Sequence, residues 1–155
     1  MHGWAIVIAV DTNILVYADR EESTFHANAL AALRLLAEGD EAWAVPVFCV
    51  DEFFRIVSHD RLFDPPTPII DAVDSIDSLL ASPSARLLTP GDRHLRLLRR
   101  LIEESQVSGN LIFDAKIAAV CLEHGATTLL TEDRDFSRFR SLQSMTVAEF
   151  LSLKA

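Results

Sequence analysis

The expected fold of this chain follows from the stretch AIVIAVDTN, residues 5–13. Ala5–Val10 is a continuous apolar run rich in β-branched side chains, which is typical of a central parallel strand covered on both faces. A short helix, Thr12–Ala18, is predicted to follow at once. Asp11 therefore stands at the junction between a buried strand and a helix, where its carboxylate is conspicuous.

Strands and helices alternate along the rest of the sequence. Expected helices run from a Ser23 or Thr24 cap to Gly39, from Pro46 to about Ser58, from the Thr67-Pro68 pair onward, over Asp92–Ser105 and over Asn110–His124. Expected strands are Ala42–Val45, Ala85–Leu88, Thr127–Leu130 and one near Met145–Val147, before a C-terminal turn of helix. This alternation predicts an α/β sandwich with a central, mostly parallel sheet flanked by helices, formed as a single domain over residues 1–155.

Composition places few limits on function. Half of the 155 residues are hydrophobic, which is enough for a packed core. The formal net charge of −9 does not exclude a nucleic-acid substrate, because overall charge says little about a local site. Cys49 and Cys121 are expected to be buried, reduced thiols of a cytoplasmic protein. The apolar run Trp4–Val10 is too short for a membrane helix and ends on Asp11, so no membrane association is expected.

Two acids follow strands. Asp11 comes directly after the first strand, and Asp133 comes three residues beyond Leu130, with Thr131 between them. Ligands of open parallel sheets bind in the crevice outside the carboxyl ends of the strands. If the two strands are neighbours, both carboxylates point to the same edge of the sheet.

Two further acids lie in helices that are otherwise apolar. Glu52 is surrounded by valine, phenylalanine and isoleucine, and Asp114 by leucine, isoleucine, phenylalanine and alanine. Burying an unpaired charge costs several kcal/mol, so each carboxylate needs a neutralising partner. Arg55 is one turn from Glu52 and leaves a structural ion pair as the simpler interpretation. The adjacent Asp51 points about 100° away on a helix and is the less suitable acid.

Four carboxylates in one cleft would repel one another. Two unit charges about 4 Å apart interact at roughly 4 kcal/mol when the effective dielectric constant is about 20. Mg²⁺ or Mn²⁺ removes this penalty and prefers oxygen ligands, whereas the five histidines are too scattered for a zinc site. One or two such ions could activate water for attack on a phosphodiester.

The sequence resembles the VapC family of PIN-domain ribonuclease toxins over almost its whole length. Four blocks in the same order and spacing carry the resemblance: VDTNIL at residues 10–15, Pro46 with EFFRI at 52–56, Gly109-Asn110 with Asp114-Ala115, and TEDRDF at 131–136. The resemblance implies a PIN-like three-layer sandwich and an Mg²⁺- or Mn²⁺-dependent endoribonuclease. It also implies a homodimer silenced by a small VapB-like antitoxin.

Carried over by position, the resemblance makes Asp11, Glu52, Asp114 and Asp133 the catalytic and metal-binding acids. Asp135 resembles an accessory metal-site acid that orients the attacking water, and it competes with Asp133 for the place of fourth acid. Thr131 resembles a hydroxyl that lines the pocket. Polar supporting roles are implied for Asn13 and Asn110.

RNA requires positive charge near the acids. Arg134 and Arg138 follow Asp133 directly and are candidates for phosphate contacts. Arg93 and Arg96, with Arg100, form a row on the helix expected at 92–105, where an ordinary solvated helix face is the alternative interpretation.

Other protein classes with acids at strand ends fit less well. A phospho-acceptor receiver domain needs a second acid after its first strand and a late lysine, and a haloacid-dehalogenase-type phosphatase needs Asp-x-Asp, where this chain has Asp11-Thr12-Asn13. The remaining rival is a PIN fold that binds RNA or protein without cleaving it. An incomplete acid set would favour that rival, and here the set is complete.

Overall fold

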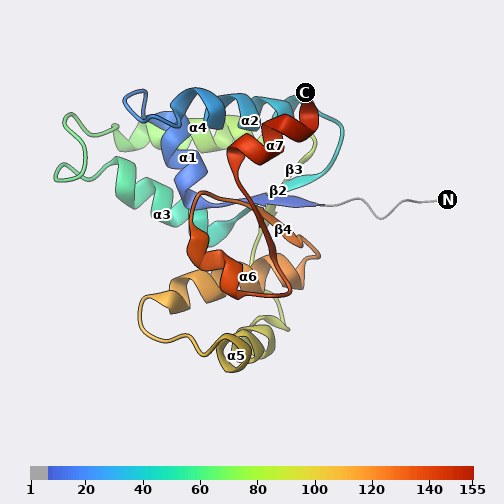
Figure 1. The fold of residues 1–155 in the computed structure, drawn as a ribbon. Coiled ribbons are helices and arrows are strands. Elements are labelled where there is room, and N and C mark those ends of the chain that lie inside the picture. Colours follow the sequence, from blue (N-terminus) through green and yellow to red (C-terminus); the bar gives the residue numbers. More distant parts are fainter. Residues whose placement is uncertain (1–6) are drawn as a thin grey trace.

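The computed structural model describes residues 7–155 and is built on a five-stranded sheet (Figure 1). The strands are β1 (Ile8–Val10), β2 (Trp43–Pro46), β3 (Ala85–Leu88), β4 (Thr128–Leu130) and β5 (Gln143–Met145). Their order is β3-β2-β1-β4-β5, and every neighbouring pair is parallel. The prediction of a mostly parallel sheet is confirmed. Residues 5 and 6 of the expected first strand lie outside the described part of the chain.

Helices cover both faces of the sheet. They are α1 (Thr12–Asp19), α2 (His26–Glu38), α3 (Val47–Val57), α4 (Ile69–Leu80), α5 (His94–Ser105), α6 (Leu111–Glu123) and α7 (Val147–Lys154), with a short 3₁₀ helix, η1 (Arg134–Arg138). In Figure 1, α1, α2, α4 and α7 lie on one side of the sheet, whereas α5 and α6 lie on the other. The predicted three-layer α/β sandwich is therefore confirmed.

The central strands are buried because helices cover them on both sides. Ala9 and Val10 of β1 and Leu129 and Leu130 of β4 have no exposed surface. Burying one such valine or leucine side chain contributes about 1.5–3 kcal/mol, which explains the unbroken apolar runs in these strands. Within residues 7–155, no helix combines the length and the apolar character needed to cross a membrane.

Several element boundaries differ from those expected. The last strand is β5, which ends at Met145; Thr146 is instead the N-cap of α7, and its capping box with Glu149 starts the helix. Neither Ser23 nor Thr24 caps α2, which begins at His26. The strand preceding Thr131 starts at residue 128, one later than predicted.

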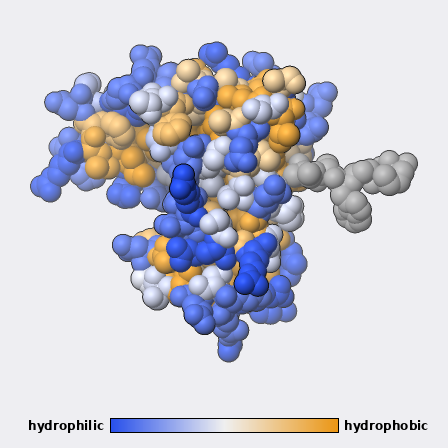
Figure 2. Space-filling model, viewed as in Figure 1, coloured by the Kyte–Doolittle hydropathy of each residue, from blue (hydrophilic) through white to orange (hydrophobic). Residues whose placement is uncertain are grey.

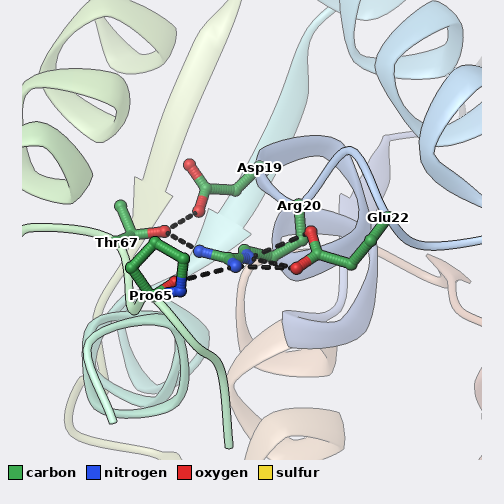
Figure 3. Close-up of polar contacts among 5 residues, drawn as sticks. All are labelled: Asp19, Arg20, Glu22, Pro65 and Thr67. Atoms are coloured by element: carbon green, nitrogen blue, oxygen red, sulfur yellow. Dashed lines mark hydrogen bonds and ion pairs between the residues drawn. The ribbon is translucent and has the colours of Figure 1, made fainter. Parts of the chain in front are cut away.

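The predicted Thr67 cap of α4 is wrong, because the Thr67 side chain has other partners. Its hydroxyl donates to Asp19 at 2.7 Å and accepts from the Arg20 guanidinium at 3.0 Å, while Pro68 occupies the N-cap position (Figure 3). Arg20 also donates to the Pro65 carbonyl and pairs with Glu22. These contacts bind the connection between α3 and α4 to the C-terminal end of α1.

Candidate metal centre

A cleft of about 300 Å³ opens at the carboxyl ends of β1 and β4. Four segments supply its walls: α1, the middle of α3, the start of α6 and the segment after β4. Its lining residues are Asp11, Thr12, Asn13, Val16, Tyr17, Glu52, Ile56, Asp114, Ile117 and Asp133. The four acids predicted to converge therefore line one cleft.

Asp11 is held in place by donors from three segments. Its Oδ1 accepts the backbone N–H of Thr12 at 2.7 Å and faces the Cys49 thiol at 3.7 Å. Its Oδ2 accepts the Thr131 hydroxyl at 2.7 Å. The Asp11 N–H donates to Leu130, which continues the β1–β4 pairing. As the N-cap of α1, Asp11 is fixed where strand and helix meet.

The Asp11 carboxyl is also costly to ionise. Only 5% of the residue is exposed, and this burial is the main cause that raises its pKa from 3.8 to about 6. The negative charges of Asp133 and Glu52 raise the pKa further, whereas the hydrogen bonds from Thr131 and Thr12 lower it. A buried carboxyl at a cleft of like charges requires a compensating cation when it is ionised.

Three other acids approach one another more closely. Asp114, Asp133 and Asp135 each offer a carboxylate oxygen, and these three atoms all lie within 4.8 Å of one another. Asp133 is the N-cap of η1, and its Oδ1 accepts the backbone N–H of Asp135 at 2.9 Å. Both members of the Asp133 and Asp135 pair therefore stand at the cluster, and Asp133 is the one that also lines the cleft.

Asp114 has the larger pKa shift. Burial is again the main cause, and the pKa of this carboxyl rises from 3.8 to about 7. The charges of Asp133, Asp11 and Asp135 add to the rise. The Arg138 guanidinium opposes it. Without a bound cation, the cluster thus stores electrostatic repulsion that falls mainly on Asp114.

Glu52 faces the same cleft from α3. Its side chain is 40% exposed, and one carboxylate oxygen lies 3.6 Å from the Arg55 guanidinium. Exposed ion pairs at this distance contribute little to stability, so the Glu52 carboxylate remains available for other contacts in the cleft. The neighbouring Asp51 is exposed and is not part of the cleft wall, as the helical geometry predicts.

The predicted polar supports are placed differently from one another. Thr131 donates to Asp11 and accepts the Asp133 N–H at 3.0 Å, so it connects two of the acids. Asn13 lines the cleft and approaches Thr131 at 3.4 Å, while its buried Oδ1 has no partner among residues 7–155. Asn110 is exposed at the start of α6 and does not line the cleft.

The candidate arginines fall into two groups. Arg138 lies 3.4 Å from the Asp135 carboxylate, and Arg134 is exposed beside Asp133. Arg93 donates to the backbone carbonyl of Glu123, at the opposite end of α6 from Asp114, so its guanidinium has a structural partner. Arg96 is exposed on α5, which packs against α6 away from the cleft.

Sequence reasoning overlooked one residue that lines the cleft and one buried residue that contacts the cleft acid Asp11. Tyr17 lies one turn after Asn13 on α1, and burial together with the charges of Glu132 and Asp11 raises the pKa of its hydroxyl. The helical spacing from Asn13 could have revealed this position. Cys49 was predicted only as a buried thiol, which it is; its approach to Asp11, the N-cap of α1, needs the packing of α3 against α1 and has no sequence signal.

The residues present fit a divalent cation. The donor set is made of carboxylate oxygens, which hard ions such as Mg²⁺ and Mn²⁺ prefer. Three of these oxygens are close enough to share an ion, and the buried Asn13 Oδ1 is a further oxygen without a partner among the described residues. Asp114, Asp133 and Asp135 would hold the ion, with Asp11 and Glu52 on the adjoining walls.

Comparison of the sequence with known proteins identifies the family. Residues 8–142 match the PIN domain family. The ribonuclease VapC43 of Mycobacterium tuberculosis is 42% identical over 137 residues, which cover 88% of this chain and 92% of that protein. The ribonuclease VapC25 of the same species is 34% identical over 134 residues, or 86% of this chain and 94% of the relative.

The fold also resembles that of solved structures. The solved structure of VapBC2 from Rickettsia felis superimposes with a TM-score of 0.65 and 20% identity, covering 90% of this chain and 98% of the matched chain. The family match and the shared fold define the chain as a PIN domain. Within that class, the chain belongs to the VapC ribonuclease family.

Substitution of Asp114 tests whether the acids repel one another. Because the folded-state pKa of Asp114 is raised, metal-free stability should fall as pH rises from 3.8 to about 7 and then level off. An asparagine does not ionise, so Asp114→Asn removes the part of this loss of stability that comes from residue 114. We expect the metal-free variant to melt no lower than wild type at neutral pH. Its free energy of unfolding should be higher by on the order of 1 kcal/mol.

Calorimetry with and without Mg²⁺ measures the effect. Magnesium should stabilise wild type by mass action and the variant much less. Asp51→Asn, which removes an exposed acid outside the cleft, is the control and should respond to Mg²⁺ like wild type. If metal-free Asp114→Asn melts well below wild type and both respond alike to Mg²⁺, then Asp114 is a structural ion-pair member.

Proposed function

We propose that this protein is a metal-dependent endoribonuclease and the toxin of a toxin–antitoxin pair. The observation that carries the proposal is the convergence of Asp11, Glu52, Asp114 and Asp133 on one cleft, with Asp135 in the three-carboxylate cluster. Membership of the VapC ribonuclease family supports RNA as the substrate. The cofactor proposed is Mg²⁺ or Mn²⁺, as one or two ions.

The acids divide the work by their surroundings. Asp114, Asp133 and Asp135 hold the cation, while Asp11 keeps the cleft floor rigid through its three donors. Glu52 is half-exposed on the opposite wall, where its carboxylate can accept a proton from an attacking water. When bound, the ion supplies the positive charge that offsets the developing charge on the phosphodiester.

The phosphate backbone needs positive groups at the rim of this acidic cleft. Arg138 and Arg55 each lie within 4 Å of a cleft-side carboxylate, so both guanidinium groups are available next to the proposed reaction centre. Arg134 is exposed on the adjoining segment. We propose these three arginines as phosphate contacts. Arg93 is left out because its partner, Glu123, lies at the opposite end of α6 from Asp114.

A PIN fold that binds without cleaving is the alternative. That function would not require all the acids to be kept together in one cleft. Here the acids remain grouped despite the cost that is visible in the raised pKa values of Asp11 and Asp114. Retaining such a cost favours catalysis over binding alone.

Paired variants on α3 test the proposed activity. Wild-type protein should cleave single-stranded and structured RNA with Mg²⁺ or Mn²⁺, and EDTA should stop the reaction. Glu52→Gln should slow cleavage by roughly 100-fold or more, which corresponds to a loss of about 2.7 kcal/mol of transition-state stabilisation. The adjacent Asp51→Asn should leave the rate unchanged, since Asp51 is exposed and outside the cleft.

The readout is a gel-based cleavage assay under single-turnover conditions, with the melting temperature of each variant measured alongside. Equal rates for Glu52→Gln and wild type, from preparations free of host nuclease, would contradict the assignment. An Asp11→Asn variant provides an independent check, because its amide can still accept from Thr12 or Thr131 while the negative charge is lost.

A groove next to the cleft supports an antitoxin as partner. The groove has a volume of about 640 Å³ and lies among α1, α2, α3 and α4. Its apolar wall includes Leu15, Leu30 and Phe53. Because α1 and α3 line both the groove and the cleft, a peptide in the groove could extend across these helices and place an arginine or lysine against the acids, where its charge replaces that of the metal. The solved Rickettsia felis relative is VapBC2, bound to a DNA fragment from their promoter.

Three further features complete the proposal. We propose a homodimer, and exposed Phe113 on α6 and Leu95 on the neighbouring α5 offer apolar surface for a second copy. The free, buried thiols of Cys49 and Cys121 suit the reducing cytoplasm, where RNA substrates also lie. Among residues 7–155, one hydrophobic cluster spans both helical layers. This cluster supports our proposal of one domain over residues 1–155.

Expression tests the partner. The chain alone should impair growth of a bacterial host, and co-expression of a small gene adjacent to its own should relieve the effect. Leu30→Arg places a charge in the groove and should keep toxicity while losing relief. Leu35→Arg, on the exposed face of the same helix outside the groove, should be relieved like wild type.

The measurements are growth curves and co-purification of the two proteins. Full relief of Leu30→Arg would place the antitoxin elsewhere. A chain that is harmless at high expression would contradict the toxin assignment while leaving the nuclease assignment to the cleavage assay.

A further inference from the structure

A second pocket adjoins the acid-lined cleft. It has a volume of about 350 Å³ and shares Tyr17 and Asp133 with that cleft, so the two hollows are adjacent. Its lining residues are Tyr17, Phe25, Thr131, Glu132, Asp133, Arg134, Ser144, Met145, Thr146 and Glu149. Anything bound here lies directly beside the proposed reaction centre.

One wall of this pocket is aromatic. The rings of Tyr17 and Phe25 are stacked, with centroids 4.9 Å apart and planes 26° from parallel. Phe25, at the N-cap of α2, is 39% exposed, so part of its side chain is accessible to a ligand. A planar ring is well suited to extend such a stack, because π-faces attract one another in offset geometry.

The opposite side of the pocket is polar. The Glu132 carboxylate accepts the Val147 N–H through Oε2 at 2.8 Å, which fixes the side chain and leaves Oε1 as an acceptor. Ser144 adds a hydroxyl, and exposed Arg134 adds a positive charge at the rim. The combination of an aromatic wall, a fixed acceptor and a rim cation matches the parts of a nucleotide: a flat ring, N–H donors and a phosphate.

We propose that this pocket is a base-binding subsite, which holds an unstacked nucleobase next to the phosphodiester that is cut. The inference rests on the proposed ribonuclease function and deepens it. The base stacks on Phe25, its hydrogen-bonding edge faces Glu132, and Arg134 contacts the neighbouring phosphate. The pocket favours guanine, which carries N1–H and N2–H₂ side by side: Oε1 of Glu132 can accept one of these donors, and Oε2, which already accepts the Val147 N–H, has a second lone pair for the other.

The shared residues give the subsite a direct connection to cleavage. Thr131 lines the pocket, donates to Asp11 and accepts from Asp133. A base seated in the pocket therefore lies against the same side chain that positions two of the acids. Seating the correct base would place the adjoining phosphate over the acids, so the choice of cleavage site follows from the choice of base.

Substitutions at Phe25 test the stacking. Phe25→Leu keeps apolar bulk against Tyr17 but removes the π-face, whereas Phe25→Trp keeps it. Binding of short fluorescent oligoguanylate, oligoadenylate, oligouridylate and oligocytidylate is measured by anisotropy in EDTA, where no cleavage occurs. We expect oligoguanylate to bind wild type most tightly, Phe25→Leu to weaken it about fivefold or more, and Phe25→Trp to retain it. Glu132→Gln should reduce the preference for guanine over the other bases.

Kinetics with Mg²⁺ separate seating from chemistry. Phe25→Leu should raise KM and leave kcat within about twofold of wild type, since the acids are untouched. Leu35→Ala, which removes exposed apolar surface at the other end of α2, is the control for nonspecific loss and should bind and cleave like wild type.

The two proposals fail in different ways. If wild type cleaves RNA but Phe25→Leu and Glu132→Gln bind and cleave like wild type, the base subsite is wrong and the nuclease stands. If the chain binds oligoguanylate through Phe25 but cleaves no RNA, the subsite stands and the nuclease assignment is wrong. Equal affinity of wild type for all four oligonucleotides overturns the assignment of guanine.

Discussion

The contact between the Thr131 hydroxyl and the Asp11 carboxylate is the interaction on which the site depends. It joins the end of β1, the central strand of the sheet, to the end of the neighbouring β4, and it orients an acid that is almost fully buried. The same hydroxyl accepts the Asp133 N–H, so one threonine sets the spacing of two acids on different strands. The same carboxylate is the N-cap of α1 and accepts the Thr12 N–H, which stabilises the start of the helix.

That arrangement imposes a second constraint. Once β1 and β4 are neighbours, Asp11 and Asp133 share an edge, and the helices α3 and α6 bring Glu52 and Asp114 to it. Burial and mutual repulsion then raise the pKa values of Asp11 and Asp114, in a fold whose net stability is only about 5–15 kcal/mol. A divalent cation would resolve the conflict, so the proposed metal binding and the proposed catalysis fall on the same residues.

Much of this could be predicted from the sequence. The apolar runs identified the parallel strands, and a lone acid after a strand or inside an apolar helix identified Asp11, Glu52, Asp114 and Asp133. The family resemblance then assigned these four acids to one catalytic and metal-binding site. Glu52 could be separated from Asp51 because the helical period alone decides which of two adjacent side chains faces inward.

Other features depend on contacts between distant segments. The Thr67 hydroxyl binds Asp19 rather than capping α4, and the Arg93 guanidinium binds the Glu123 carbonyl rather than facing the cleft. Neither partner is near in sequence. The pocket beside Tyr17 likewise needs α2 to deliver Phe25 against α1, which no local pattern reports. Sequence therefore identified the chemistry of the site better than its boundaries.

The central claim is that these carboxylates are held together at a cost that a cation removes. Proton release on adding Mg²⁺ to metal-free protein in weakly buffered solution tests it most directly, because a cation displaces protons from acids whose pKa values are raised. With pKa values of about 6 for Asp11 and about 7 for Asp114, release should be clear between these pH values and vanish well above them. An absence of proton release throughout this range, with the protein folded, would contradict the account.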